Sequence, residues 1–152
     1  MVLPFGNGTE RILENKNLDS AFLGLNFNTH DQSHLFRAAQ EGIVFAMKYG
    51  FDILQQMGLK SNVIRAGHAN MFLSQVFREA FVNTTGARLE LYNTDGSKGA
   101  ALGAGVGAGI YRSFKEAFTG LTSVDHLEPD PIKSEQYQLA YTHWKNNLNQ
   151  FL

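Results

Sequence analysis

The chain has no cysteine among its 152 residues, which excludes a disulfide scaffold and any metal site built from thiolates. No apolar run reaches the roughly 18 residues that a transmembrane helix needs. The first residues, MVLPFGNG, contain neither a basic segment nor a long apolar stretch, so we expect no signal peptide. These absences together predict a cytoplasmic protein with no membrane partner.

Charged residues are also scarce, at 18% of the chain against roughly 25% in a typical soluble domain. The formal net charge is −1 and the Lys and Arg residues form no basic stripe, so nucleic acid is not expected as a partner. Low charge together with 12 Phe leaves two interpretations open. In the first interpretation, another domain or a second copy in a homodimer covers part of the apolar surface. In the second, the apolar residues fill a large core within the domain itself.

The spacing of apolar residues predicts strands that alternate with helices. We expect strands over residues 21–27, 63–66 and 89–92, and helices over 31–58, 70–82, 98–118 and from 134 onward. Residues 1–20 and 121–130 are predicted to be irregular, because Pro and Gly interrupt them. This order predicts an α/β layer architecture.

Short polar residues mark where these helices begin. Asp31 or Ser33 is predicted to cap the first helix, Ser97 the small-residue helix and Ser134 the last one. The apolar stripe of the last helix, which includes Tyr141 and Trp144, is predicted to pack in the core.

Two segments point to a ligand. Residues 62–73 (NVIRAGHANMFL) predict a short buried strand, a Gly turn and a helix, and such a turn presents free backbone N–H groups. Residues 99–111 (GAALGAGVGAGIY) predict a helix with almost no side-chain bulk, which lets a flat ligand or another backbone approach closely. Together the two segments predict a nucleotide site.

The order and spacing of three motifs resemble the C-terminal half of the FGGY carbohydrate kinases, and most closely the xylulokinases. The first motif is SAFLGL at residues 20–25, followed after eight residues by HLFRAAQE at 34–41. The second is RAGHAN at 65–70, where His68 stands in place of a second Gly, and the third is GAALGA at 99–104. Upstream, Leu3-Pro4 and GTER at residues 8–11 are similar to a stretch of xylulokinases.

The resemblance implies an actin-like, ribonuclease-H-like fold, of which residues 1–152 would form the C-terminal FGGY domain. It implies ATP and Mg²⁺ as cofactors, with Mg²⁺ held mainly outside this chain, and phosphoryl transfer to a sugar, D-xylulose in the first place. The phosphate loop and the catalytic Asp of the family are not in the sequence. We therefore expect a truncated chain that binds the adenosine end of ATP or ADP without catalysing the transfer.

The resemblance assigns the adenosine contacts to Gly67, His68, Asn70, Ala101 and Gly103. Each assignment has a structural alternative. Gly67 can be a turn glycine that needs a positive φ, Asn70 a helix cap, and His68 a surface residue. Gly99, Gly103 and Gly107 repeat every four residues, a spacing that also suits close packing of the helix against a neighbour.

Other patterns are weaker. Arg37 and Glu41 are spaced as an intrahelical ion pair. No acidic HExxH pattern surrounds His30 and His34, so no metal site is expected there. The Gly-x-Gly-x-x-Ala run that begins at Gly103 lies inside a predicted helix and not at a strand end, which disfavours a dinucleotide fold. A non-catalytic packing or dimerisation domain of the same fold remains the alternative function.

Overall fold

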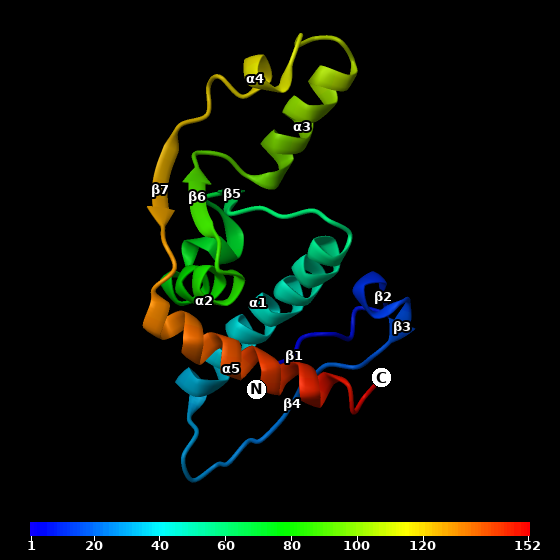
Figure 1. The fold of residues 1–152 in the computed structure, drawn as a ribbon, viewed down its shortest axis with the longest axis vertical. Helices are drawn as coiled ribbons and strands as arrows, with labels where there is room; N and C mark the ends of the chain where they lie inside the picture. Colours follow the sequence, from blue (N-terminus) through cyan, green and yellow to red (C-terminus); the bar gives the residue numbers. More distant parts are fainter.

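The computed structural model describes all of residues 1–152 and shows an elongated α/β molecule (Figure 1). A three-stranded sheet occupies its middle, with α3 and α4 beyond one end of the sheet and α1, α2 and α5 packed below. The helices are α1 (Gln32–Gln56), α2 (Gln75–Thr85), α3 (Gly96–Gly107), α4 (Phe114–Ala117) and α5 (Pro131–Leu148). The strands are β1 (Val2–Leu3), β2 (Thr9–Glu10), β3 (Lys16–Asn17), β4 (Ala21–Phe22), β5 (Val63–Gly67), β6 (Arg88–Tyr92) and β7 (Ser123–Leu127).

The main sheet has the strand order β5-β6-β7. β5 and β6 run parallel, with Val63 opposite Arg88 and Gly67 opposite Tyr92. β7 runs antiparallel to β6. Because β5 and β6 are parallel, their carboxyl ends meet at the same edge of the sheet, which is where α/β proteins place ligands.

One face of this sheet is covered and the other is open. Leu89 and Leu91 of β6 are fully buried, and Ile64 and Ala66 of β5 pack against the same core. The alternate positions, which include Arg65 and Glu90, point to the opposite face. The sheet is therefore amphipathic, with its polar face free of helices in this chain.

The core lies between α1, α2 and α5. Its largest fully buried side chains are Trp144, Tyr141, Phe77 and Phe81. The indole N–H of Trp144 donates a hydrogen bond to the carbonyl oxygen of Val2 (2.8 Å), which ties α5 to the first strand. The sequence also places Phe151 in the apolar stripe of the last helix. The stripe is confirmed as core at Tyr141 and Trp144, whereas Phe151 lies beyond α5 and is exposed.

The start of α1 agrees with the sequence prediction. Asp31 is its N-cap, and its carboxylate accepts the backbone N–H groups of Ser33 and His34. Hydrogen bonds from the Ser33 hydroxyl and then from His34 hold the pKa of this carboxyl well below its usual range. Six residues into the helix, the Nε–H of Arg37 donates to Glu41 (2.8 Å), so the predicted ion pair is also confirmed.

Several predicted elements near the N-terminus and in the middle of the chain are wrong in extent. The strand expected over 21–27 shortens to β4, which ends before Gly24 at φ +68°, and β4 pairs with β1 in the segment expected to be irregular. The helix expected over 70–82 divides into a 3₁₀ turn at Asn70–Leu73 and α2. Ser74 separates them, because its hydroxyl accepts the N–H of Phe77 and so begins a new helix.

In the second half of the chain, three elements differ from the sequence predictions. Asp95, and not Ser97, caps α3, and the helix expected over 98–118 ends at Gly107, because Gly109 takes a left-handed φ of +75°. The loop expected over 121–130 contains β7, which β6 holds by pairing. α5 starts three residues before Ser134, because Asp130 caps it and Pro131 fits its first turn.

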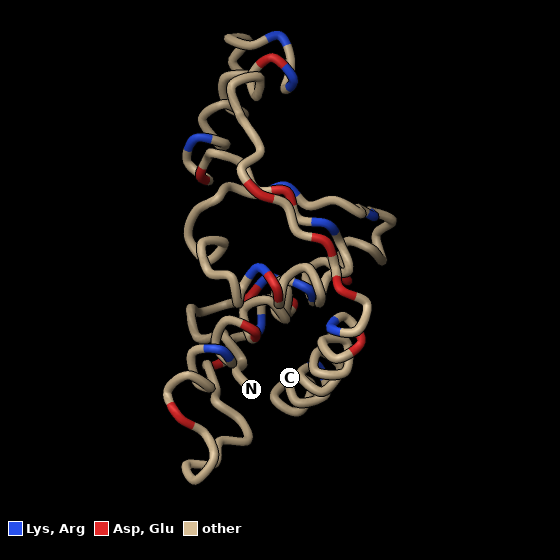
Figure 2. Tube along the Cα trace, turned by 90° about the vertical axis from the view of Figure 1, so that its left-hand side faces the viewer, with Lys and Arg blue, Asp and Glu red and all other residues tan.

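Charges of both signs are interspersed along the chain trace, and no element carries a run of one sign (Figure 2). No helix in the structure combines the length and the apolar character that crossing a membrane requires.

Candidate functional site

A cavity of about 750 Å³ opens at the carboxyl ends of β5 and β6. Its walls come from these two strand ends, from the first turn of α3, from α4 and from Leu121. Its lining includes Arg65, Gly67, Asp95, Gly96, Gly99, Phe114, Lys115 and Phe118. The cavity therefore joins the two segments in which the sequence predicts a nucleotide site.

Gly67 ends β5 where two loops cross closely. The N–H groups of His68 (2.8 Å) and Thr94 (2.7 Å) both donate to the carbonyl oxygen of Tyr92, which brings the two loops together. An alanine side chain at Gly67 would meet the carbonyl oxygen of Thr94 and lie 3.0 Å from Cα of Asp95. The φ of Gly67 is not positive, so the alternative of a turn glycine is wrong, and glycine is required by close backbone approach.

The first turn of α3 presents backbone donors to the cavity. The carboxylate of Asp95 accepts the N–H of Lys98 (2.8 Å) and so caps the helix. The N–H groups at the start of a helix have no carbonyl partner in a preceding turn, and they attract negative charge. Gly96 and Gly99 line the cavity without side chains, so this end of α3 is open to a ligand.

The opposite wall is aromatic. Phe114 and Phe118 stack with their ring planes 9° apart and their centroids 6.2 Å apart. The hydroxyl of Ser113 accepts the N–H of Glu116 (3.2 Å) and so caps α4, the short helix that carries Phe114. A reciprocal pair of hydrogen bonds between Asn93 and Thr122 holds the segment after α4 beside the end of β6. The tertiary fold thus brings a flat apolar wall toward the glycine turn.

The five predicted contact residues do not all reach this cavity. Gly67 lines it, whereas His68, Asn70, Ala101 and Gly103 are not among the lining residues. His68 and Asn70 are exposed on the turn after β5. Asn70 has a φ of +52° and caps no helix. Gly103 lies one turn beyond the lining residue Gly99 on α3, and Ala101 is exposed on that helix.

The small-residue face of α3 is not packed. A side chain added at Gly99, Gly103 or Gly107 would meet no atom within 4 Å, so the expected close packing against a neighbour is absent in this chain. The packed glycine is Gly105, where an added Cβ would lie 2.8 Å from the ring of Tyr111.

Sequence reasoning missed the aromatic wall and the charged residues of the cavity, Arg65, Asp95 and Lys115. Phe114 and Phe118 were placed in one long helix, and their spacing by four residues gave no sign of a ligand wall. Arg65 was read only as part of the RAGHAN motif. The signal that could have found Asp95 is its residue type, because Asp directly before a helical segment is a favoured N-cap.

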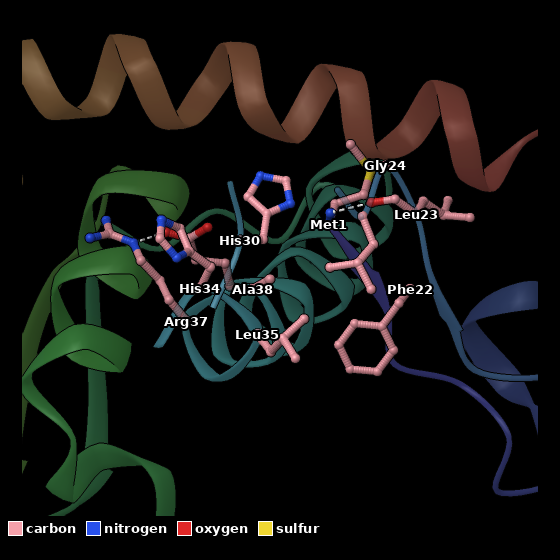
Figure 3. A pocket seen from close by; sticks show the side chains of 11 residues that line it. Met1, Phe22, Leu23, Gly24, His30, His34, Leu35, Arg37 and Ala38 are labelled. Carbon is pink, nitrogen blue, oxygen red and sulfur yellow. Dashed lines mark hydrogen bonds and ion pairs between the residues drawn. The ribbon is translucent and has the colours of Figure 1, made fainter. Parts of the chain in front are cut away.

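A second, smaller cavity of about 200 Å³ lies between β4 and the start of α1 (Figure 3). Its lining includes Met1, whose terminal amino group donates to the carbonyl oxygen of Leu23 (2.8 Å), and the two histidines His30 and His34. The imidazole rings are 5.5 Å apart, and Nδ1 of His34 is engaged by Asp31 (2.8 Å). This arrangement builds the local turn and the cap of α1 and offers no strand-end geometry for a nucleotide.

Comparison with known proteins identifies the class to which this architecture corresponds. No family model matches the chain. The xylulose kinase of Rhodospirillum rubrum superposes with a TM-score of 0.79 at 21% identity, over 99% of this chain and 30% of that one. The glycerol kinase of Plasmodium falciparum with ADP superposes with a TM-score of 0.73 at 22% identity, over 100% of this chain and 30% of that one. The fold is therefore that of the C-terminal portion of the actin-like sugar kinases, as the resemblance implied.

Curated relatives match the sequence as well. The xylulose kinase of Haemophilus influenzae is 28% identical over 158 residues, which cover 98% of this chain and 31% of the relative. The L-xylulose/3-keto-L-gulonate kinase of Escherichia coli is 32% identical over 149 residues, which cover 95% of this chain and 28% of the relative. These matches confirm the resemblance to the carbohydrate kinases, and the chain spans about 30% of the length of these relatives.

Proposed function

We propose that this chain is the nucleotide-binding segment of an FGGY carbohydrate kinase and that it holds ATP or ADP in the cavity at the ends of β5 and β6. The observation that carries the proposal is the composition of that cavity. It combines the glycine that ends β5, the open start of a helix and an aromatic wall at the carboxyl edge of parallel strands. The solved glycerol kinase of the same fold contains ADP, which supports a nucleotide as the ligand.

The two ends of the cavity differ in chemistry, and this difference orients the nucleotide. Phe114 and Phe118 offer an apolar flat surface on which a purine base can stack. The first turn of α3 offers backbone donors beside the carboxylate of Asp95, and the side chain of Arg65 offers positive charge at the end of β5. Lys115 of α4 adds a second positive charge next to the aromatic wall. A nucleotide bound with its base on the aromatic wall and its phosphates toward β5 and α3 satisfies both ends.

The chemistry of the complete enzyme would be transfer of the γ-phosphoryl group to a sugar hydroxyl. The two curated relatives named above, a xylulose kinase and an L-xylulose/3-keto-L-gulonate kinase, support xylulose as the sugar, giving xylulose 5-phosphate, and gluconate, ribulose and glycerol are the alternative substrates. Such transfer depends mainly on positioning, Mg²⁺ and a carboxylate base. No group of three or more His, Asp or Glu in this chain could hold a metal ion, so we assign it nucleotide binding and no step through Mg²⁺. We propose that the protein acts in the cytoplasm and that nucleic acid is not a partner.

The alternative is a packing or dimerisation domain without nucleotide binding. Large apolar side chains on its surface favour this alternative: Phe27 is 87% exposed, and Met57 and Leu59 are 71% and 61% exposed. These side chains lie on the loop before α1 and at the end of α1, away from the residues that line the cavity. Both properties can therefore belong to one chain, and nucleotide binding decides between the two functions.

The deciding experiment is a titration of the isotope-labelled chain with Mg-ADP, followed by amide NMR shifts. We expect saturable shifts at Gly67, Gly96 and Gly99, with Phe27 and Leu59 unchanged as internal controls. NADH at the same concentrations is the control ligand, and we expect its shifts to be smaller and not saturable. A well-dispersed spectrum that ADP leaves unchanged would support the packing domain. We further expect the chain alone to show no ATP-dependent phosphorylation of D-xylulose in a coupled ADP-release assay.

A further inference from the structure

Arg65 and Lys115 are the two basic residues that line the cavity, and only Arg65 lies at the end of the sheet. Arg65 lies on β5 two residues before Gly67, on the polar face of the sheet. Its side chain is 67% exposed, while its partner Glu90 on β6 is only 12% exposed. The resemblance to the carbohydrate kinases assigned no role to this residue.

Glu90 fixes the orientation of Arg65. The Nε–H of Arg65 donates to Oε2 of Glu90 (2.9 Å), and the hydroxyl of Tyr92 donates to the same oxygen (3.1 Å). The other carboxylate oxygen pairs with the guanidinium of Arg88 (2.7 Å). The hydrogen bond from Arg65 is the main reason that the pKa of Glu90 lies below its usual value.

Within the chain, Arg65 donates its Nε–H to Glu90 (2.9 Å), and the hydroxyl of Tyr92 also lies close enough to the guanidinium to help raise the pKa of Arg65. Glu90 makes no contact with the two terminal amino groups, which lie at the cavity. A planar guanidinium held by one edge presents its remaining donors as a rigid fork that matches phosphate oxygens. A surface arginine without such a holder would lose more side-chain freedom on binding.

We infer that Arg65 binds the phosphate groups of the nucleotide with its terminal amino groups, and that Glu90 is the positioning residue that aims it. The inference rests on the proposed nucleotide function and extends it, because it predicts that the site distinguishes a nucleotide from a nucleoside. The aromatic wall binds the base whether or not phosphates are present. Arg65 therefore contributes to ADP binding and not to adenosine binding.

The test compares ADP and adenosine on matched arginine variants by isothermal titration calorimetry. Arg65→Met keeps the apolar stem and removes the charge, and we expect it to weaken ADP by about 10- to 100-fold, the range of a charge-assisted hydrogen bond. Its adenosine affinity should stay within about 2-fold. Arg88→Met is the control, because Arg88 shares Glu90 but does not line the cavity. It should leave both affinities within about 2-fold.

Two further measurements separate positioning from a purely structural role. Glu90→Gln keeps the shape of the side chain, and we expect it to weaken ADP less than Arg65→Met does. The double variant should bind ADP no more weakly than Arg65→Met, because Glu90 acts through Arg65. Arg65→Lys, which keeps the charge but not the fork, should recover part of the ADP affinity. Far-UV circular dichroism verifies that each variant folds.

The binding measurements separate the role of Arg65 from the proposed nucleotide function. If the unmodified chain binds ADP but Arg65→Met binds it equally well, or loses ADP and adenosine affinity equally, the role of Arg65 is refuted and the nucleotide function stands. If the folded, unmodified chain binds neither ligand, the proposed function fails, and the role of Arg65 fails with it.

Discussion

Replacing Gly67 with alanine tests the close approach of the two loops that form the floor of the cavity. The added methyl group would meet the carbonyl oxygen of Thr94 and lie 2.9 Å from its carbonyl carbon and 3.0 Å from Cα of Asp95. All three are backbone atoms, which cannot rotate away as a side chain can. The loop that leads into α3 must therefore move.

The size of the effect follows from two opposing contributions. Overpacking typically costs about 1–3 kcal/mol when backbone must shift. Replacing glycine by alanine gains about 0.4–1 kcal/mol by restricting the unfolded chain. Because the contacts here are with backbone, the steric cost exceeds the gain, and we expect Gly67→Ala to lower the free energy of unfolding by about 1–2 kcal/mol.

Gly103→Ala is the matched control. The same methyl group on α3 would meet no atom within 4 Å, so only the gain remains. We expect Gly103→Ala to raise the free energy of unfolding by about 0.5–1 kcal/mol, the helix preference of alanine over glycine.

Urea unfolding followed by far-UV circular dichroism measures both variants. With m near 2 kcal/mol/M, the midpoint for Gly67→Ala should fall by about 0.5–1 M, while that for Gly103→Ala rises. Isothermal titration calorimetry then measures the affinity of each variant for ADP. Gly67→Ala should weaken ADP binding, because the shifted loop displaces the backbone donors of α3. Equal stability of the two variants would refute the close approach. A loss of ADP affinity in Gly103→Ala would support the contact that the sequence resemblance assigned to Gly103.

Three further predictions concern the cavity wall and the core. Phe114→Ala should weaken ADP and adenosine alike, by about 5- to 100-fold for the loss of one base-stacking surface, and calorimetry that finds ADP alone affected would contradict the stacking role. Trp144→Phe should lower the free energy of unfolding by about 2–4 kcal/mol, because it opens a cavity in the core and removes the donor to Val2; urea unfolding followed by circular dichroism measures this, and a loss below about 1 kcal/mol would contradict it. Burial is the main cause that raises the pKa of Tyr141, and the hydrogen bond that its hydroxyl donates to Asp52 (2.6 Å) adds to it. The neutral phenol therefore stabilises the fold at pH values below the ordinary phenol pKa near 10. This contribution to the free energy of unfolding is lost as pH rises above that value. Tyr141→Phe should therefore lose about 1–3 kcal/mol at pH 7 and show a shallower further loss between pH 10 and 12 than the unmodified chain, and parallel profiles would contradict this reasoning.

Local chemistry allowed part of the structure to be predicted from the sequence. The cap of α1 at Asp31 and the pair between Arg37 and Glu41 depend on residues three or four positions apart, so the chain near each residue decides them. The strands β5 and β6 were found because each is a short apolar run next to a turn. The family motifs, read in order, gave the correct fold class for the same reason, since each motif is a local run of residues.

Interactions between distant residues decided the rest. β7 has an Asp and a His at its centre, and only its pairing with β6 makes it a strand. The helix expected over 98–118 divides because Tyr111 packs back on Gly105 and Gly109 takes a left-handed conformation. Neither event follows from the apolar spacing of the segment.

The site shows the same division. The sequence alone determined that a Gly-containing segment follows one short strand and that a small-residue helix follows the next, because apolar runs and residue size are local properties. Only the pairing of β5 with β6 in parallel places both segments at one edge of the sheet. Only the tertiary structure decided that Thr94 makes Gly67 obligatory, that Phe114 and Phe118 face this turn, and that Glu90 holds Arg65 at the cavity. These contacts join residues between 25 and 51 positions apart, and side-chain packing and strand register, which set them, exist only once the sheet has formed.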